Sequence, residues 1–241
     1  MIDAALAEAF EASWPAAETA RAGGFVVGRG LGAGGRVSSA RVAGDWAEDD
    51  IEAAEAVHAG WNQRPVFRVW DDDASLIRAL LARGYAAEIP TLVLDAPLAP
   101  LADPPLPVMR CFAIWPPLAI QRQIWAEGSI NPARQAVMAR VALPKAAILA
   151  RISDRAAGAG FVALAGDVAM LHGVEVPPEF RRKGVASWIV RQVAQWAAEA
   201  GGTRLALAVS RGNTAARGLY DRLGFREAGS YAYYARPSGR C

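Results

Sequence analysis

The stretch VEVPPEFRRKGVAS, Val174–Ser187, joins an apolar segment to a helical pattern through two prolines and a basic loop that contains glycine. Pro177 and Pro178 cannot donate to a strand ladder, so they end the apolar strand. Successive backbone N–H groups in the loop can converge at the start of the next helix, where the helix dipole is positive. Gly184 allows close approach of the backbone to a ligand. The stretch predicts a strand, a loop suited to a pyrophosphate and a helix; a basic loop before a surface helix is the alternative.

A second helical pattern, NTAARGLYDRLGF (Asn213–Phe225), follows after one further strand. Asn213 is a good N-cap residue for this helix. Asn213 and Tyr220 are about two helical turns apart and therefore share a face. This spacing places the Tyr220 hydroxyl at a fixed point beside the preceding strand, although a core tyrosine would explain the residue as well.

Together the two segments resemble the cofactor motifs of the GNAT superfamily of acyltransferases. RRKGVA (Arg181–Ala186) is similar to the signature [Gln/Arg]-x-x-Gly-x-[Gly/Ala], with Ala186 where many members have glycine. The segment Asn213-x-x-Ala-x-x-x-Tyr-x-x-x-Gly-Phe225 is similar to the second motif of the superfamily. The order of the two motifs is also that of the family, and the resemblance extends from about Val108 to Arg236.

The resemblance implies that the site binds acetyl-CoA. The backbone of Val174 and Val176 would hold the acetyl and pantetheine groups, and Asn213 would contact the pantetheine. Tyr220 would lie near the thioester sulfur as a general acid. The residues implied for the pyrophosphate are Arg181, Arg182, Lys183, Gly184, Val185, Ala186 and Ser187, and Ala216 belongs to the second motif.

Acetyl transfer to an amine needs a base, because an amine with a pKa near 10 is mostly protonated at neutral pH. Glu175 is the first candidate, acting through water, since it is an acid in an otherwise apolar strand. A salt bridge or a solvent-facing position would explain Glu175 as well. His172 is the reserve candidate because the pKa of imidazole is favourable. We expect the oxyanion to meet a backbone donor on the strand containing Val174–Val176.

The N-terminal half repeats the pattern of strand, helix, Gly-aromatic pair and strand, with Val66–Trp70 as the counterpart of Leu205–Val209. Between the halves, Ala96–Pro107 contains five prolines in twelve residues, which predicts an extended linker with neither helix nor ladder. We therefore divide the chain into a degenerate GNAT-like domain (1–95), a linker (96–107) and a catalytic GNAT domain (108–241). The predicted fold class is α/β (α+β): two GNAT-like domains, each a mixed, mostly antiparallel sheet flanked by helices.

The N-terminal counterpart of the basic loop is AGDWAEDD (Ala43–Asp50), which has four acids and no lysine or arginine. This loop would repel a pyrophosphate, so we expect the N-terminal half not to bind CoA and to shape the acceptor cleft instead. An unrelated α/β cap is the alternative. The segment GLGAGG (Gly30–Gly35) matches Gly-x-Gly-x-x-Gly, but a dinucleotide site needs a helix there. Arg36–Ala43 favours a strand, so we predict a glycine-rich hairpin turn.

The composition gives no reason to expect a nucleic-acid or membrane partner, because 26 basic and 24 acidic residues leave a net charge of only +2. The two cysteines (Cys111 and Cys241) and the two histidines (His58 and His172) are far apart. We therefore expect no metal site and a cytoplasmic location. The N-terminal segment lacks the features of a signal peptide, and no apolar run is long enough to span a bilayer.

These observations favour an enzyme that moves acetyl from acetyl-CoA to a primary amine by direct attack in a ternary complex. The acceptor would be a small molecule or a peptide. The alternatives are a non-catalytic acyl-CoA sensor and a transferase of another acyl or aminoacyl group. The presence of Tyr220 favours an enzyme over a sensor. No motif specifies the acceptor, the acyl chain preference or the oligomeric state.

Overall fold

The computed structural model describes residues 2–103, 106–107 and 109–237. Within these residues the strands are β1 (Glu18–Ala22), β2 (Phe25–Arg29), β3 (Ala40–Val42), β4 (Val66–Trp70), β5 (Ala86–Pro97), β6 (Cys111–Ile114), β7 (Lys145–Ile152), β8 (Arg155–Ala165), β9 (Val168–Glu175), β10 (Arg204–Ser210) and β11 (Arg226–Ala235). They form one sheet in the order β1-β2-β3-β4-β11-β5-β10-β9-β8-β7-β6.

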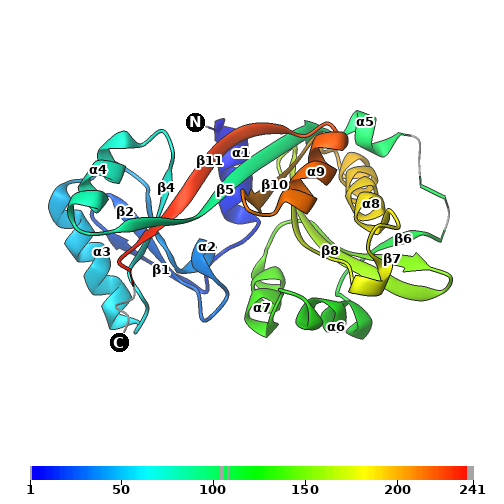
Figure 1. Ribbon diagram of the computed structural model, residues 1–241, viewed down its shortest axis with the longest axis horizontal. Coiled ribbons are helices and arrows are strands. Elements are labelled where there is room, and N and C mark those ends of the chain that lie inside the picture. The colour runs from blue at the N-terminus through cyan, green and yellow to red at the C-terminus, as the bar shows by residue number, and fades with distance from the viewer. Residues whose placement is uncertain (1, 104–105, 108, 238–241) are drawn as a thin grey trace.

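Helices cover the sheet in both halves of the molecule (Figure 1). Those of the described residues are α1 (Ala4–Ala12), α2 (Gly35–Ser38), α3 (Glu48–Gly60), α4 (Ala74–Ala82), α5 (Ala99–Ala102), α6 (Ala119–Glu127), α7 (Pro132–Arg140), α8 (Val185–Glu199) and α9 (Thr214–Arg222), with a 3₁₀ turn at Pro178–Phe180. Each of these helices is too short or too polar to span a bilayer.

The two halves are joined by β5 and β11, which run side by side across the middle of the molecule (Figure 1). β5 belongs to the N-terminal half by sequence, yet it pairs with β10 of the C-terminal half. β11 is the last strand, yet it pairs with β4 of the N-terminal half. Both pairings are antiparallel, and the parallel pairs of the described sheet are β3 with β4 and β9 with β10. The predicted fold class, a mixed and mostly antiparallel sheet flanked by helices, is confirmed.

This shared centre predicts one cooperative unfolding transition for the whole protein. Neither half can open without breaking a strand pair that also belongs to the other, so the two halves should not melt separately. Differential scanning calorimetry should show a single endotherm whose calorimetric and van't Hoff enthalpies agree. Two resolved endotherms, or partial proteolysis that releases one folded half, would contradict this expectation.

The C-terminal half of the sheet is packed on both faces. Phe161 and Val162 are neighbours on β8 and enter different cores: Phe161 packs with Trp125 of α6, and Val162 with Ile189 of α8. Glycines on β8 allow α8 to lie close, because a Cβ at Gly160 would stand 2.6 Å from the Ile189 side chain. α8 is thereby fixed against the sheet, which positions the start of that helix.

The expectation of an extended linker at 96–107 without helix or ladder is wrong for its first part. β5 continues to Pro97, and the short helix α5 follows at once. Leu98 and Leu101 are buried and pack with residues of α8. Proline is accepted in a first helical turn, where its missing N–H has no intrahelical partner anyway. Pro104 and Pro105 lie outside the described residues, and the domain boundary stays a prediction.

The expectation of a strand over Arg36–Ala43 is wrong in its first half. The one-turn helix α2 begins at Gly35, and strand β3 starts only at Ala40. Gly34 has φ +97°, a conformation that side chains disfavour, and this turn directs the chain into α2. β2 and β3 are antiparallel neighbours, so the glycine-rich segment and α2 together connect the two strands of a hairpin. The same half also contains β1, which the sequence did not predict.

Candidate functional site

A cavity of about 990 Å³ opens where β9 and β10 separate. The two strands pair in parallel up to Leu171 and Leu207. Beyond this point, residues 172–176 and 208–210 line the cavity. Backbone groups on strand edges that have parted need other partners, and a ligand with amide groups can supply them.

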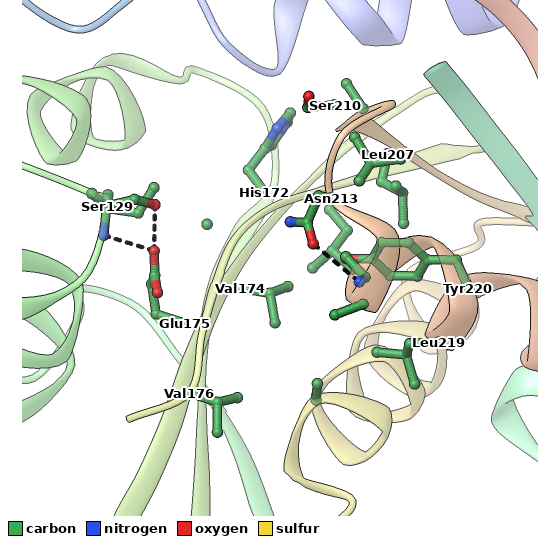
Figure 2. A pocket seen from close by; sticks show the side chains of 18 of the residues that line it. Ser129, His172, Val174, Glu175, Val176, Leu207, Ser210, Asn213, Leu219 and Tyr220 are labelled. Atoms are coloured by element: carbon green, nitrogen blue, oxygen red, sulfur yellow. Dashed lines mark hydrogen bonds between the residues drawn. The ribbon is translucent and has the colours of Figure 1, made fainter. Parts of the chain in front are cut away.

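A β-bulge shapes the β9 side of the opening. The pairing with β8 shifts register between His172 and Glu175, and Gly173 has φ +57°. A Cβ at Gly173 would stand 2.9 Å from Met138, so this position suits glycine in both conformation and space. The side chains of Val174 and Val176 lie on one side of the strand, and Glu175 lies on the other (Figure 2). The bulge thus separates an apolar surface from an acidic one at the mouth of the cavity.

The basic loop leads into α8 as predicted. Arg181, Arg182 and Gly184 are exposed, and all three line the cavity. Gly184 adopts the left-handed conformation (φ +83°) as the N-cap of α8, and no described side chain caps this helix. Val185, Ala186 and Ser187 also line the cavity. The first turn of α8 therefore presents N–H groups and the positive end of its dipole to the opening.

Arg181 and Lys183 of the basic loop each contact another part of the protein, which the sequence did not predict. The Nε of Arg181 donates a hydrogen bond to the carbonyl of Val176 at 3.1 Å, which ties the loop to the end of β9. The Nζ of Lys183 lies 5.8 Å from the centre of the Phe180 ring. Lys183 does not line the cavity in the described structure, unlike the other residues predicted for the pyrophosphate.

In the N-terminal counterpart of this loop, an acidic side chain of the loop itself accepts hydrogen bonds from the backbone. The Asp50 carboxylate accepts hydrogen bonds from the N–H groups of Gly24 and Ala47, each at 3.0 Å. These bonds lower the pKa of Asp50. The start of α3 is thus occupied by a fixed negative charge, where α8 has a glycine and an open first turn.

Helix α9 carries the second predicted motif. The Oδ1 of Asn213 accepts a hydrogen bond from the Ala216 N–H at 3.1 Å, which confirms Asn213 as the N-cap (Figure 2). Asn213, Ala216 and Tyr220 all line the cavity. Tyr220 is 7% exposed and packs against Phe225. Burial raises the pKa of Tyr220 to about 12, so its hydroxyl keeps its proton at neutral pH.

Glu175 is held on the opposite side of β9 from Tyr220 (Figure 2). Its Oε1 accepts hydrogen bonds from the backbone N–H of Ser129, at 2.8 Å, and from the Ser129 hydroxyl. A Cβ at Gly128 would stand 2.5 Å from the Glu175 carboxyl carbon, so glycine there makes room for it. Glu175 is therefore neither in a salt bridge with a described residue nor simply solvent-facing, and it lines the cavity.

His172 also lines the cavity but is a weaker candidate for the base. Its Nε2 lies 3.0 Å from the Ser13 Oγ, and its Nδ1 lies 3.5 Å from an Nη of Arg36. Burial, together with the neighbouring Arg36 guanidinium, holds the pKa of His172 well below its usual value. An imidazole with so low a pKa is neutral but has little affinity for a proton.

The N-terminal half contributes part of the cavity wall. Trp14, Ala33, Gly34, Gly35 and Arg36 line it together with the C-terminal residues. Tyr231 and Tyr233 of β11 line it as well. Motif comparison missed these residues, because they come from segments with no cofactor signature. The alternation Tyr231-x-Tyr233 was the one available signal, since it places both rings on the same face of a strand.

The model of the acetyltransferase (GNAT) family matches residues 118–225 of this chain. This segment belongs to the GNAT family. The GNAT segment contains β9, the loop before α8 and the whole of α9, so the family match covers the predicted cofactor motifs.

Relatives and solved structures agree with this assignment. The aminoglycoside N(6')-acetyltransferase type 1 of Acinetobacter baumannii is 35% identical over 72 residues, which is 30% of this chain and 49% of that protein. The chain thus spans about half the length of the curated relatives it matches.

Two solved structures share the fold over most of the chain. A GCN5-related N-acetyltransferase from Kribbella flavida has a TM-score of 0.71 at 18% identity and covers 98% of this chain and 94% of its own. A tandem GNAT protein from the clavulanic acid biosynthesis pathway has a TM-score of 0.60 at 14% identity, with 81% and 74% covered. At such identities the likeness concerns the fold, and it supports two GNAT-like halves.

Proposed function

We propose that this protein is an N-acetyltransferase that moves acetyl from acetyl-CoA to a primary amine by direct attack in a ternary complex. The observation that carries the proposal is the parting of β9 and β10 beside the open first turn of α8. One side of this opening offers N–H groups and arginines to a pyrophosphate, and the other offers strand edges to an extended amide chain.

The residues present fit CoA. Gly184 has no Cβ to keep phosphate oxygens away from the backbone, and Arg181 and Arg182 add charge without blocking the cavity. Val174 and Val176 present backbone groups where β9 has left β10. Acetyl-CoA would supply an acetyl group activated as a thioester. In this proposal the first turn of α8 would hold the pyrophosphate, the edge of β9 would hold the amide chain, and Tyr220 would lie at the thioester.

Proton transfers are assigned to residues on the two sides of β9. Glu175, fixed by Ser129, accepts the proton of the substrate ammonium through a water molecule. A backbone N–H of the bulged segment 173–176 stabilises the oxyanion. Tyr220, which is protonated at neutral pH, donates its proton to the sulfur that leaves. His172 contributes packing and cavity shape in this scheme.

The function is tested by incubating the protein with acetyl-CoA and a panel of primary amines, with thiol release as the measurement. We expect amine-dependent release of CoA, and acetylated product by mass spectrometry. If acetyl-CoA binds but no amine causes the release of CoA, the result would favour the acyl-CoA sensor instead.

Replacing Gly184 with aspartate should weaken CoA binding. A carboxylate about 4 Å from a phosphate costs about 1–4 kcal/mol, depending on solvent screening, which corresponds to about 5- to 900-fold in Kd. Isothermal titration calorimetry with CoA measures the effect. Gly84→Asp is the matched control: Gly84 has φ +77° with open space around it, follows α4 and does not line the cavity. If CoA binds both variants with equal affinity, the start of α8 is not part of the CoA site.

A further inference from the structure

Arg36 places a guanidinium on the part of the cavity wall that the N-terminal half contributes. It comes from α2, is partly buried and lines the cavity beside His172. One of its Nη groups donates to the Phe10 carbonyl, and the guanidinium carbon lies 3.7 Å from the centre of the Phe10 ring. These contacts fix the side chain, yet they use only part of its five N–H donors. No described carboxylate lies within ion-pair distance of Arg36.

The described residues around Arg36 do not balance its positive charge. Glu11 is the acid whose charge acts on Arg36, and its carboxylate already pairs with Arg68 and, at 3.0 Å, with Arg41. The Arg68 side chain is only 3% exposed. Burial, and to a smaller extent the proximity of Arg68, lowers the pKa of Arg36. Arg41 and Arg68 therefore occupy the Glu11 carboxylate, and Arg36, which borders the cavity, is left without a carboxylate partner among the described residues.

Two further donors border the same part of the cavity. Tyr231 and Tyr233 are 2% and 8% exposed, and their hydroxyl oxygens are 3.5 Å apart. Burial raises the pKa of Tyr233 well above its usual value, so the phenol stays protonated. A planar guanidinium beside two phenol hydroxyls is a donor set that suits a carboxylate.

The cavity wall also carries a negative charge, on Glu175. Glu175 is the one acid among the described residues that line the cavity, whereas Arg36, Arg134, Arg181, Arg182 and Arg222 all line it. His172 contacts Arg36 and is three residues from Glu175 on β9. Because the bulge sets these two residues opposite Phe161 and Ala159, which are two apart on β8, the separation is about 7 Å at the rise of a strand. An amine directed toward Glu175 and an anion held by Arg36 therefore fit one elongated molecule.

We propose that the acceptor is a primary amine that also carries a carboxylate, and that Arg36 binds this carboxylate. The inference rests on the proposed function, because the amine end is defined by the transfer site. A polycationic amine such as an aminoglycoside would bring several positive charges against Arg36 and Arg134, with Glu175 alone to attract them. The arrangement therefore selects amino-acid-like acceptors over polyamines.

The test compares amines that differ only in the carboxylate: L-lysine with cadaverine, and 6-aminohexanoate with pentylamine. Binding to the CoA-saturated protein is measured by isothermal titration calorimetry, and acetylation by thiol release. We expect the carboxylate to tighten Kd about 10- to 100-fold within at least one pair, the effect of a hydrogen bond to a charged group. Kanamycin serves as the polycationic comparison and should be acetylated more slowly than the preferred amino acid.

Arg36→Gln should remove this selectivity and leave CoA binding unchanged. Arg36→Lys keeps the charge but loses the planar fork, so it should retain part of the preference. Arg78→Gln, at an exposed position of α4 that does not line the cavity, is the matched control. If Arg36 only supports the fold, Arg36→Gln would lower Tm but keep the ratio of Kd values within each pair.

The outcomes separate this inference from the proposed function. If both members of each pair bind the wild-type protein equally, or none binds, the inference is wrong whatever the variants do. Acetylation of cadaverine, pentylamine or kanamycin at rates at or above those of the amino acids would also overturn it while supporting acetyl transfer. Carboxylate-dependent binding without any thiol release would instead overturn the transferase and leave Arg36 as a carboxylate site.

Discussion

Replacing Tyr220 with phenylalanine should lower kcat for acetyl transfer about 100-fold or more, with little change in the KM for acetyl-CoA. The variant keeps the ring that packs against Phe225 and removes only the hydroxyl assigned to the leaving sulfur. General acids contribute about 10²–10⁴ in rate, which sets the size of the effect. Thiol release under saturating acetyl-CoA gives kcat, and thermal unfolding checks that the fold is intact.

The elevated pKa of Tyr220 adds a dependence on pH. A tyrosine with its ordinary pKa would be half ionised near pH 10, whereas at a pKa of about 12 about 99% of Tyr220 is still protonated there. The rate should therefore not fall between pH 8 and pH 10 through loss of this proton. Tyr85→Phe is the matched control, because Tyr85 is also buried but its hydroxyl donates to Glu55 and lies outside the cavity lining. Turnover by Tyr220→Phe at the wild-type rate would refute the acid role.

Replacing Glu175 with glutamine should lower kcat/KM about 100-fold at neutral pH. Glutamine preserves the size of the side chain and an oxygen that can accept from Ser129, so the loss isolates the basic carboxylate. The difference between variant and wild type should shrink toward pH 10, where the substrate amine loses its proton unaided. A pH profile of kcat/KM is the measurement.

Glu127→Gln is the control for this substitution. Glu127 is an exposed acid at the end of α6 that accepts a hydrogen bond from Gln123 and does not line the cavity. A Glu175→Gln variant whose deficit is the same at pH 7 and pH 10 would indicate a positioning effect in place of base catalysis. If Glu175→Gln is as active as the wild type, water or another group accepts the proton of the substrate.

The sequence was most informative where one local rule decides the structure. Asn213 predicted the start of α9 and Gly84 the end of α4, because capping depends on a few neighbouring residues. The two prolines and the basic loop correctly predicted the end of β9 and the start of α8. These are the elements that carry the cofactor motifs, so most of the candidate site follows from the sequence.

What the sequence did not predict depends on contacts between distant segments. Nothing in Arg226–Ala235 indicates that this strand pairs with β4 of the other half, since strand partners are chosen by the assembled core. The bulge at Gly173 depends on the room that Met138 leaves. The sequence did not indicate Arg36, because the pattern of Arg36–Ala43 favours a strand, whereas α2 turns the residue toward His172.

The pairing of β5 and β11 with strands of the opposite halves has a consequence for synthesis on the ribosome. β4 ends at Trp70, but its neighbour in the finished sheet begins only at Arg226. At about 5–20 residues per second the ribosome needs on the order of ten seconds or more to make the intervening chain. During that interval the edges of β4 and β5 lack a partner that only the last strand provides. Chaperone capture of nascent chains should therefore concentrate on this interval and end when β11 emerges.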